Sequence, residues 1–116
     1  ALPICDMGLF ANMFGKGEKA DLTAETLKPQ RVKVLDVRSR REYQGGHIAG
    51  AKSMDVSSPD FAQAVKRLNA KTTYLVYCQS GSRSSRAAGA MRGAGLTVLD
   101  GGGMRKMQSN GWTIGP

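Results

Sequence analysis

The sequence predicts an α/β protein, a parallel β-sheet with helices on both faces. Two runs rich in apolar, aromatic and β-branched residues, 32–37 and 73–77, have the length of buried strands. Shorter extended pieces are expected near Ser53-Met54 and at 96–99. Helix signals separate these runs. Because strands that alternate with helices pair in parallel through right-handed crossovers, helices are expected on both faces of the sheet.

Capping residues predict where the first helices lie. Thr23 is placed to cap a short helix that runs through Leu27 and is ended by Pro29. Ser39 and Glu42 have the spacing of a capping box, in which each side chain accepts a hydrogen bond from the other residue's backbone. A helical turn is therefore expected directly after the first strand.

Three further helices are expected later in the chain. Ser58-Pro59-Asp60 offers a cap, a proline at the first position and an acid in the first turn, so a helix is predicted to start there. The small and basic residues of 83–94 predict a second helix, and Gly95 suits its left-handed C-cap. A glycine turn at 101–103 precedes a short final helix, expected over 104–109.

The chain has the length of one domain. Its 116 residues, 41% hydrophobic and 22% charged, allow a single hydrophobic core. Residues 23–116 are expected to form the domain, and residues 1–22 an N-terminal tail or a short docking helix. Residues 1–6 precede Met7, which resembles a natural start. They are interpreted as a cloning remnant, in which case Cys5 carries no function.

Charge and cysteine content narrow the range of functions. The formal net charge is +8, but the basic residues are dispersed, which indicates a solvated surface and no nucleic-acid partner. Two cysteines without a CxxC pair and one histidine make a zinc site unexpected, and no metal or other cofactor is predicted. With no membrane-spanning stretch and no visible secretory signal, we expect a cytoplasmic protein without a membrane partner.

A cysteine opens the loop after the second strand. Cys78 directly follows 73–77, at the strand end outside which parallel sheets bind their ligands. Backbone amides of a tight loop and of a helix start favour negative charge, so the pKa of the thiol should fall below roughly 8.5. Arg83 adds a positive charge to the same loop. Cys78 is therefore interpreted as a reactive thiol and not as an inert buried cysteine.

Several motifs, in order along the chain, resemble the rhodanese family in its small single-domain form. They are Leu35-Asp36-Val37-Arg38, Glu42-Tyr43, Gly46-His47-Ile48, Gly50-Ala51, the loop from Tyr77 to Ser84, and Leu99-Asp100-Gly101-Gly102. Together they cover about residues 23–112. Separate motifs in register are more specific than any one of them. The resemblance implies a single rhodanese-like domain.

The resemblance also implies an enzyme that moves a sulfane sulfur. Cys78 would attack a small anionic donor, thiosulfate or another persulfide, and would then carry the sulfur as a persulfide. Cyanide, a thiol or a protein acceptor would take that sulfur, which is covalent catalysis in two steps. Loop amides would cradle the persulfide and Arg83 would help to bind the donor. The substrate-binding residues expected are Gln79, Ser80, Gly81, Ser82, Arg83 and Ser84. This interpretation also predicts an accessible Cys78 thiol.

Two other functions stay open. Related phosphatases and arsenate reductases have one more residue between cysteine and arginine, whereas four residues separate Cys78 from Arg83 here. The shorter loop favours sulfur transfer. The chain could also be a sulfur-delivery module whose protein partner supplies or accepts the sulfur.

The remaining candidate residues are expected to be structural. His47 belongs to a turn motif distant in sequence from Cys78, and Asp36 and Arg38 are expected to fix the turn after the first strand. Trp112 is interpreted as a lid on the core. Met107 stands where the family usually has a tryptophan after the late double glycine, and it is expected to serve in packing.

Overall fold

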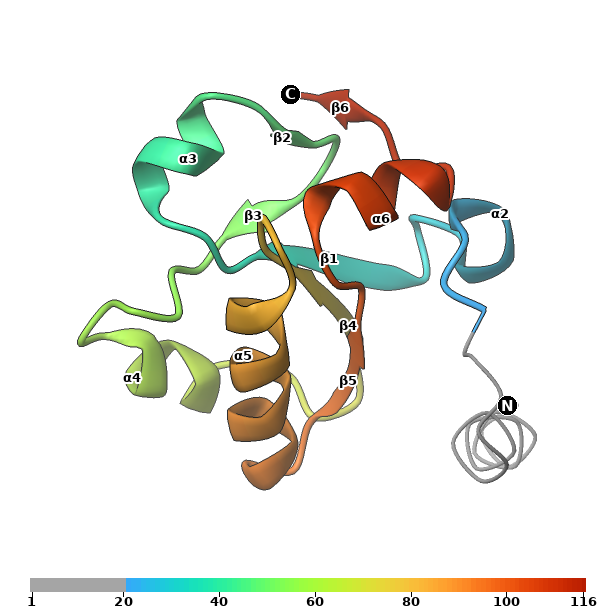
Figure 1. Cartoon of the computed structure of the whole chain (residues 1–116). Helices are drawn as coiled ribbons and strands as arrows, with labels where there is room; N and C mark the ends of the chain where they lie inside the picture. The colour runs from blue at the N-terminus through green and yellow to red at the C-terminus, as the bar shows by residue number, and fades with distance from the viewer. Residues whose placement is uncertain (1–20) are drawn as a thin grey trace.

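The computed structural model describes residues 21–116, and a four-stranded parallel sheet forms its centre (Figure 1). The sheet has the strand order β3-β1-β4-β5, and its strands are β1 Val32–Asp36, β3 Lys52–Ser53, β4 Thr73–Tyr77 and β5 Thr97–Asp100. All three strand pairs are parallel, which confirms the predicted sheet. The expected tail at 1–22, its interpretation as a docking helix and the cloning remnant at 1–6 lie almost wholly outside the described residues.

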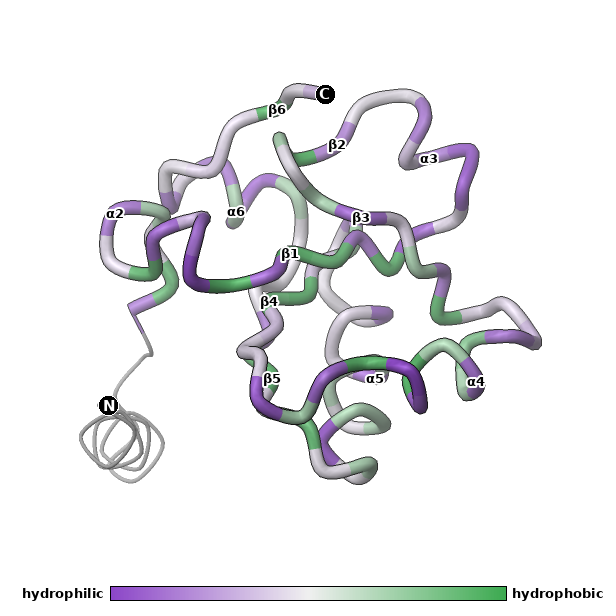
Figure 2. Tube along the Cα trace, turned by 180° about the vertical axis from the view of Figure 1, so that it is seen from behind, coloured by the Kyte–Doolittle hydropathy of each residue, from purple (hydrophilic) through white to green (hydrophobic). Residues whose placement is uncertain are grey.

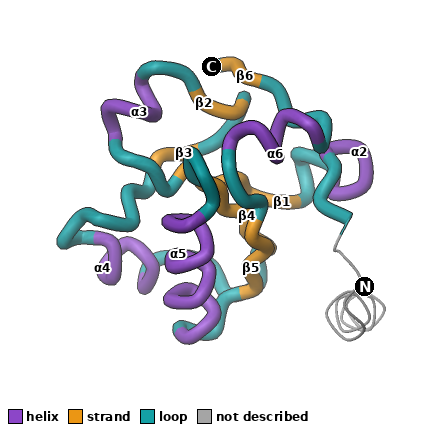
Figure 3. The backbone as a smooth tube through the Cα atoms, in the orientation of Figure 1, coloured by secondary structure: helices purple, strands orange, loops and turns teal. Residues whose placement is uncertain are grey.

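Five helices accompany the sheet among residues 21–116 (Figure 3). They are α2 Ala24–Leu27, α3 Arg40–Gln44, α4 Phe61–Lys66, α5 Ser82–Gly93 and α6 Met104–Ser109. Helices α4 and α5 cover one face of the sheet, and α2 and α6 cover the other. None of the helices between residues 21 and 116 has the length and hydropathy needed to cross a bilayer.

Each face of the sheet has its own buried core, and Figure 2 shows the hydrophobic residues concentrated along β1 and β4. The core under α4 and α5 contains Leu35, Val37, Phe61, Val65, Tyr74, Val76, Cys78, Ala87, Ala88, Met91, Leu96 and Val98. The opposite core contains Leu22, Val32, Val34, Ile48, Ala51, Leu75, Tyr77, Leu99, Met104, Met107 and Trp112. β4 is therefore almost continuously apolar because both of its faces are buried, whereas β1 carries an exposed Lys33.

Most of the predicted caps are present. The Thr23 side chain accepts a hydrogen bond from the backbone of Thr26, and both halves of the Ser39–Glu42 capping box form. Gly95 follows α5 with a left-handed φ of 92°, as expected of a residue that ends a helix.

The predicted start of α4 is wrong. This helix begins at Phe61, and Ser58 belongs to the turn before it, where its hydroxyl accepts a hydrogen bond from the Asp60 backbone at 3.1 Å. Asp55 also binds the backbone and hydroxyl of Ser57 at 2.8 and 2.6 Å. These local hydrogen bonds satisfy the backbone in a turn and so compete with helix formation.

A small second sheet was not predicted. It pairs β2 His47–Ile48 with β6 Ile114–Gly115 in antiparallel fashion. The buried hydroxyl of Tyr77 links it to the main sheet, because it accepts a hydrogen bond from the Ile48 backbone at 2.9 Å and donates one to Asp36 at 2.8 Å. Burial raises the pKa of Tyr77 well above its ordinary value, so the hydroxyl keeps the proton that it donates.

The strand order places a topological switch point between β1 and β4. From β1 the chain moves outward to β3 on one side, then crosses back to β4 and β5 on the other. Chain segments that leave neighbouring strands in opposite directions open a crevice at the carboxyl ends of those strands. The segment from Val37 to α3 and the loop that begins at Cys78 meet at these strand ends, where Arg38 contacts Gln79 and Glu42 contacts Arg83.

Replacing Tyr77 by phenylalanine tests the link between the sheets. Tyr77→Phe leaves a buried amide and a buried carboxylate each without one partner, so we expect the free energy of unfolding to fall by about 1–3 kcal/mol. Urea denaturation measures the change. Tyr74→Phe is the matched control, because the Tyr74 hydroxyl binds only the backbone of exposed Asn69. Equal losses in both variants would contradict the proposed link.

Candidate active site

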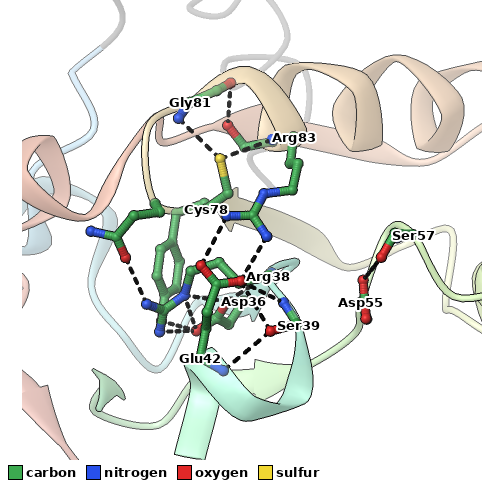
Figure 4. Close-up of polar contacts among 12 residues, drawn as sticks. Asp36, Arg38, Ser39, Glu42, Asp55, Ser57, Cys78, Gly81 and Arg83 are labelled. Carbon is green, nitrogen blue, oxygen red and sulfur yellow. Dashed lines mark hydrogen bonds and ion pairs between the residues drawn. The ribbon is translucent and has the colours of Figure 1, made fainter. Parts of the chain in front are cut away.

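The loop between β4 and α5 wraps around the sulfur of Cys78. The backbone amides of Gly81 and Ser84 donate hydrogen bonds to Sγ at 3.0 and 3.3 Å (Figure 4). Gly81 has a φ of 107°, a left-handed conformation that L side chains rarely adopt, and this turns the loop back over the cysteine. On its other side the loop is fixed by the hydrogen bond from the Cys78 amide to the Gly102 carbonyl at 3.0 Å.

These hydrogen bonds favour the thiolate. Burial raises the pKa of the Cys78 thiol, but the hydrogen bonds from the backbone of Ser84 and Gly81 outweigh burial and bring the pKa below its ordinary value. The sequence predicted this direction from the position of the loop at a helix start. The remaining amides of the predicted cradle, those of Gln79, Ser80, Ser82 and Arg83, have no hydrogen bond to Sγ.

The predicted accessibility of the thiol is wrong for this conformation, because Cys78 has 0% of its surface exposed. It closes the core under α4 and α5 on one side and is wrapped by its own loop on the other. A neighbouring group must therefore move before any substrate can reach the sulfur.

Arg83 lies between Cys78 and Glu42 (Figure 4). Its guanidinium contacts the Glu42 carboxylate through two nitrogen–oxygen pairs, at 2.7 and 3.0 Å. Hydrogen bonds from Arg83 lower the pKa of Glu42 to about 2, so the pair stays ionised at neutral pH. The positive charge expected beside the cysteine is present, but a carboxylate already balances it.

The side chain of Gln79 is turned away from the cysteine. Its Oε1 accepts a hydrogen bond from Arg38 at 2.8 Å, and its backbone carbonyl accepts one from Met104 at 3.1 Å. Arg38 is itself held by a buried ion pair with Asp36 at 2.7 Å. The structural role expected for Asp36 and Arg38 is thus confirmed, and Gln79 joins them in fixing the loop.

The three serines of the loop lie in different environments. Ser80 and Ser82 are exposed, whereas Ser84 is fully buried. The Ser84 hydroxyl lies 2.7 Å from Asp100 Oδ1, to which it donates, while its backbone amide binds Cys78. The Ser84 side chain therefore connects the start of α5 to the end of β5, while its backbone amide binds the Cys78 sulfur.

The other candidates are structural, as expected. His47 stacks on Tyr43 with ring centroids 3.7 Å apart, and its Nδ1 lies 2.9 Å from the Tyr43 carbonyl, to which it donates. Trp112 is buried and donates from Nε1 to the Leu22 carbonyl. Met107 is fully buried; its Sδ lies against Gly101, where an added Cβ would be 2.6 Å away. Within residues 21–116 no group of three or more His, Cys, Asp or Glu side chains could hold a metal ion.

The family model described as the Rhodanese-like domain matches residues 19–107. The chain belongs to this family. Its relatives include the thiosulfate sulfurtransferase GlpE of Pseudomonas fluorescens, which is 34% identical over 83 residues, 68% of this chain and 73% of GlpE. The protein YqhL of Bacillus subtilis, named as uncharacterized, is 33% identical over 70 residues, 60% of this chain and 54% of YqhL. The tRNA sulfurtransferase of Thermoplasma acidophilum is 28% identical over 69% of this chain.

This rhodanese-like domain spans only part of several relatives, including 54% of YqhL and 16% of the tRNA sulfurtransferase. Solved structures agree with the family. The rhodanese-related protein of Thermoplasma volcanium superposes with a TM-score of 0.69 at 28% identity, over 81% of this chain and 95% of that one. An E. coli rhodanese solved with anions superposes with a TM-score of 0.55 at 28% identity, over 64% of this chain and 88% of that one.

Two residues that hold the Cys78 loop in place, Glu42 and Asp100, were not among the predicted site residues. Glu42 was assigned to a capping box and quoted within the Glu42-Tyr43 motif, but its Oε2, which the cap does not use, was not expected to bind Arg83. Asp100 was quoted only within a motif, yet it accepts the Ser84 hydroxyl and the Gly102 amide. Its place at a strand end, at the same edge of the sheet as Cys78, was the available signal.

Replacing Gly81 by alanine tests the sulfur cradle. A φ of 107° strains any L side chain, so Gly81→Ala should move the amide away from Sγ and raise the pKa of Cys78. The pH dependence of alkylation of Cys78 by iodoacetamide measures this pKa. Gly89→Ala is the control, because a Cβ there meets nothing within 4 Å. An unchanged pKa in Gly81→Ala would contradict the role of this amide.

The Glu42–Arg83 pair predicts an acid-dependent stability. The pKa of Glu42 is about 2 in the folded state against an ordinary 4.5, so the pair stabilises the fold above about pH 4.5 and this stabilisation is lost as the pH falls toward 2. Because both side chains are about one-third exposed, we expect no more than about 1 kcal/mol. Glu42→Gln should lack this part of the pH dependence in urea denaturation between pH 2 and 7. A profile identical to the wild type would contradict it.

Proposed function

We propose that this chain is a sulfurtransferase that carries sulfane sulfur on Cys78. The observation that supports this function best is the pair of backbone amides, from Gly81 and Ser84, directed at Sγ. Hydrogen-bond donors at this position stabilise a thiolate before the reaction and a persulfide anion after it. Membership of the Rhodanese-like domain family and the sulfurtransferases among its relatives support the same reaction class.

In the proposed first step, the Cys78 thiolate attacks the outer sulfur of a donor such as thiosulfate. A sulfur–sulfur bond forms at Cys78, the donor's sulfur–sulfur bond breaks, and sulfite leaves with the electron pair. In the second step, cyanide or a thiolate attacks the outer sulfur of the persulfide, takes it up, and returns the Cys78 thiolate. Each step is a nucleophilic displacement in which cysteine serves as carrier.

The substrate-binding roles follow from the loop. The loop of 79–84 wraps around Cys78, and we assign its backbone amides to the transferred sulfur. Of these residues, Gly81 and Ser84 already donate to Sγ, while Ser80 and Ser82 are exposed at the rim. Gln79 fixes the position of the loop through its hydrogen bond with Arg38. Arg83 is the cation that would meet a negatively charged donor.

A sulfur-delivery module for a protein partner is the second candidate. It is supported by the length of the relatives, because the chain matches only 16% of the tRNA sulfurtransferase and 54% of YqhL. In both relatives, a large part of the protein lies outside the region that this chain matches. The two candidates share the Cys78 persulfide and differ in the acceptor.

Intact-mass spectrometry tests the proposal. After exposure to thiosulfate, the protein should gain about 32 Da, one sulfur, and cyanide should remove it, since covalent catalysis requires this intermediate. Cys78→Ser should gain nothing, whereas Cys5→Ser should behave as the wild type. A Cys78→Ser variant that still transfers sulfur would refute the function. A persulfide that cyanide removes slowly and a protein thiol removes fast would favour delivery.

A further inference from the structure

The cation of the active-site loop is already occupied by an anion of the chain itself. Arg83 binds both oxygens of Glu42, at 2.7 Å to Oε1 and 3.0 Å to Oε2. This bidentate geometry is the one with which arginine recognises free carboxylates and oxyanions. The two side chains are 30% and 33% exposed, so a dissolved anion can compete for the same guanidinium.

Glu42 is held in place independently of Arg83. Its Oε1 accepts hydrogen bonds from the Ser39 backbone and hydroxyl at 3.0 and 3.1 Å, while its own amide donates to the Ser39 hydroxyl at 3.2 Å. The capping box thus fixes the side chain at the start of α3 before any pairing takes place. A preorganised carboxylate acts on Arg83 at a high effective concentration.

We propose that Glu42 is an internal competitor for the anion site of Arg83, and that it selects sulfur donors by their charge. An oxyanion donor such as thiosulfate must displace Glu42 to reach the guanidinium, which weakens its binding. A donor without a charged oxyanion group needs no such displacement. This inference rests on the proposed function for its effect on donors, whereas the competition for anions can be tested without any turnover.

The simpler interpretation is that Glu42 only caps α3. The two interpretations separate because glutamine also completes a capping box. Glu42→Gln therefore keeps the cap and removes the charge. Ser39→Ala does the opposite, because it removes the cap and leaves the ion pair. A purely capping role predicts that Ser39→Ala is the more damaging change and that neither variant alters anion binding.

Sulfate, an unreactive oxyanion, is the probe for the anion site. Its dissociation constant is measured from the amide shifts of Gly81, Ser82 and Ser84 in ¹⁵N-labelled protein, at constant ionic strength. We expect Glu42→Gln to bind sulfate about two- to fivefold more tightly than the wild type, the range that the loss of a partly exposed ion pair allows. In an Arg83→Met background, Glu42→Gln should have no effect.

Glu25→Gln is the matched control, since it removes the same charge from an exposed position in the first turn of α2. Sulfate binding within twofold of the wild type in Glu42→Gln would overturn the proposal. So would equal tightening in Glu25→Gln, because the effect would then be one of net charge. Should Glu42→Gln fail to fold, Glu42→Asp keeps the charge on a shorter arm, and its sulfate affinity should also exceed that of the wild type.

A kinetic arm connects the competition to sulfur transfer. Glu42→Gln should lower KM for thiosulfate by a similar factor and change kcat less than twofold. The reason is that removing the competitor strengthens thiosulfate binding equally in the ground state and the transition state. If the wild type forms no persulfide, the proposed function fails, but the sulfate titration still decides the role of Glu42. If Glu42→Gln binds sulfate more tightly but keeps the wild-type KM for thiosulfate, the role in donor selection is refuted and the competition for anions stands.

Discussion

The site depends on the parallel pairing of β1 with β4, which runs through all five residues from Val32↔Thr73 to Asp36↔Tyr77. Because the two strands are in register and parallel, they end side by side at the same edge of the sheet. The chain leaves β1 toward α3 and leaves β4 toward α5, so both segments meet above this edge. The contacts from Arg38 to Gln79 and from Glu42 to Arg83 cross the gap that this register defines.

A buried polar layer beneath the loop keeps this edge rigid. Asp36 and Arg38 form an ion pair in which both side chains are almost fully buried, and they also bind Tyr77, Gln79 and the Gly46 carbonyl. Buried charges are tolerated when they are paired and hydrogen-bonded, and incomplete networks are costly. No buried side-chain nitrogen or oxygen among the described residues is left without a partner. The loop of Cys78 therefore rests on a support with few alternative arrangements.

The electrostatics of the loop come mainly from the main chain. Two backbone amides donate hydrogen bonds to the Cys78 sulfur, whereas the nearby Arg83 guanidinium forms an ion pair with Glu42. Amides fixed by a left-handed glycine and a helix start need no reorganisation when a charge develops on sulfur. Arg83 and Glu42 are both partly exposed, and in the proposal above a bound anion replaces Glu42 on the arginine. The Cys78 sulfur is fully buried, so the proposed transfer also requires a movement that exposes it.

The sequence by itself determined the features that depend on near neighbours. Alternating strand and helix signals predicted the parallel sheet, local capping patterns placed α2 and α3, and the strand end placed Cys78 at the sheet edge. The predicted start of α4 was wrong because the residues around Asp55 and Ser58 also favour a turn, and this local preference competes with helix formation. Only the tertiary structure decided that Glu42 neutralises Arg83 and that Cys78 is covered. Those outcomes join residues 41 positions apart or packed from different layers, and no pattern along the chain records which of them meet.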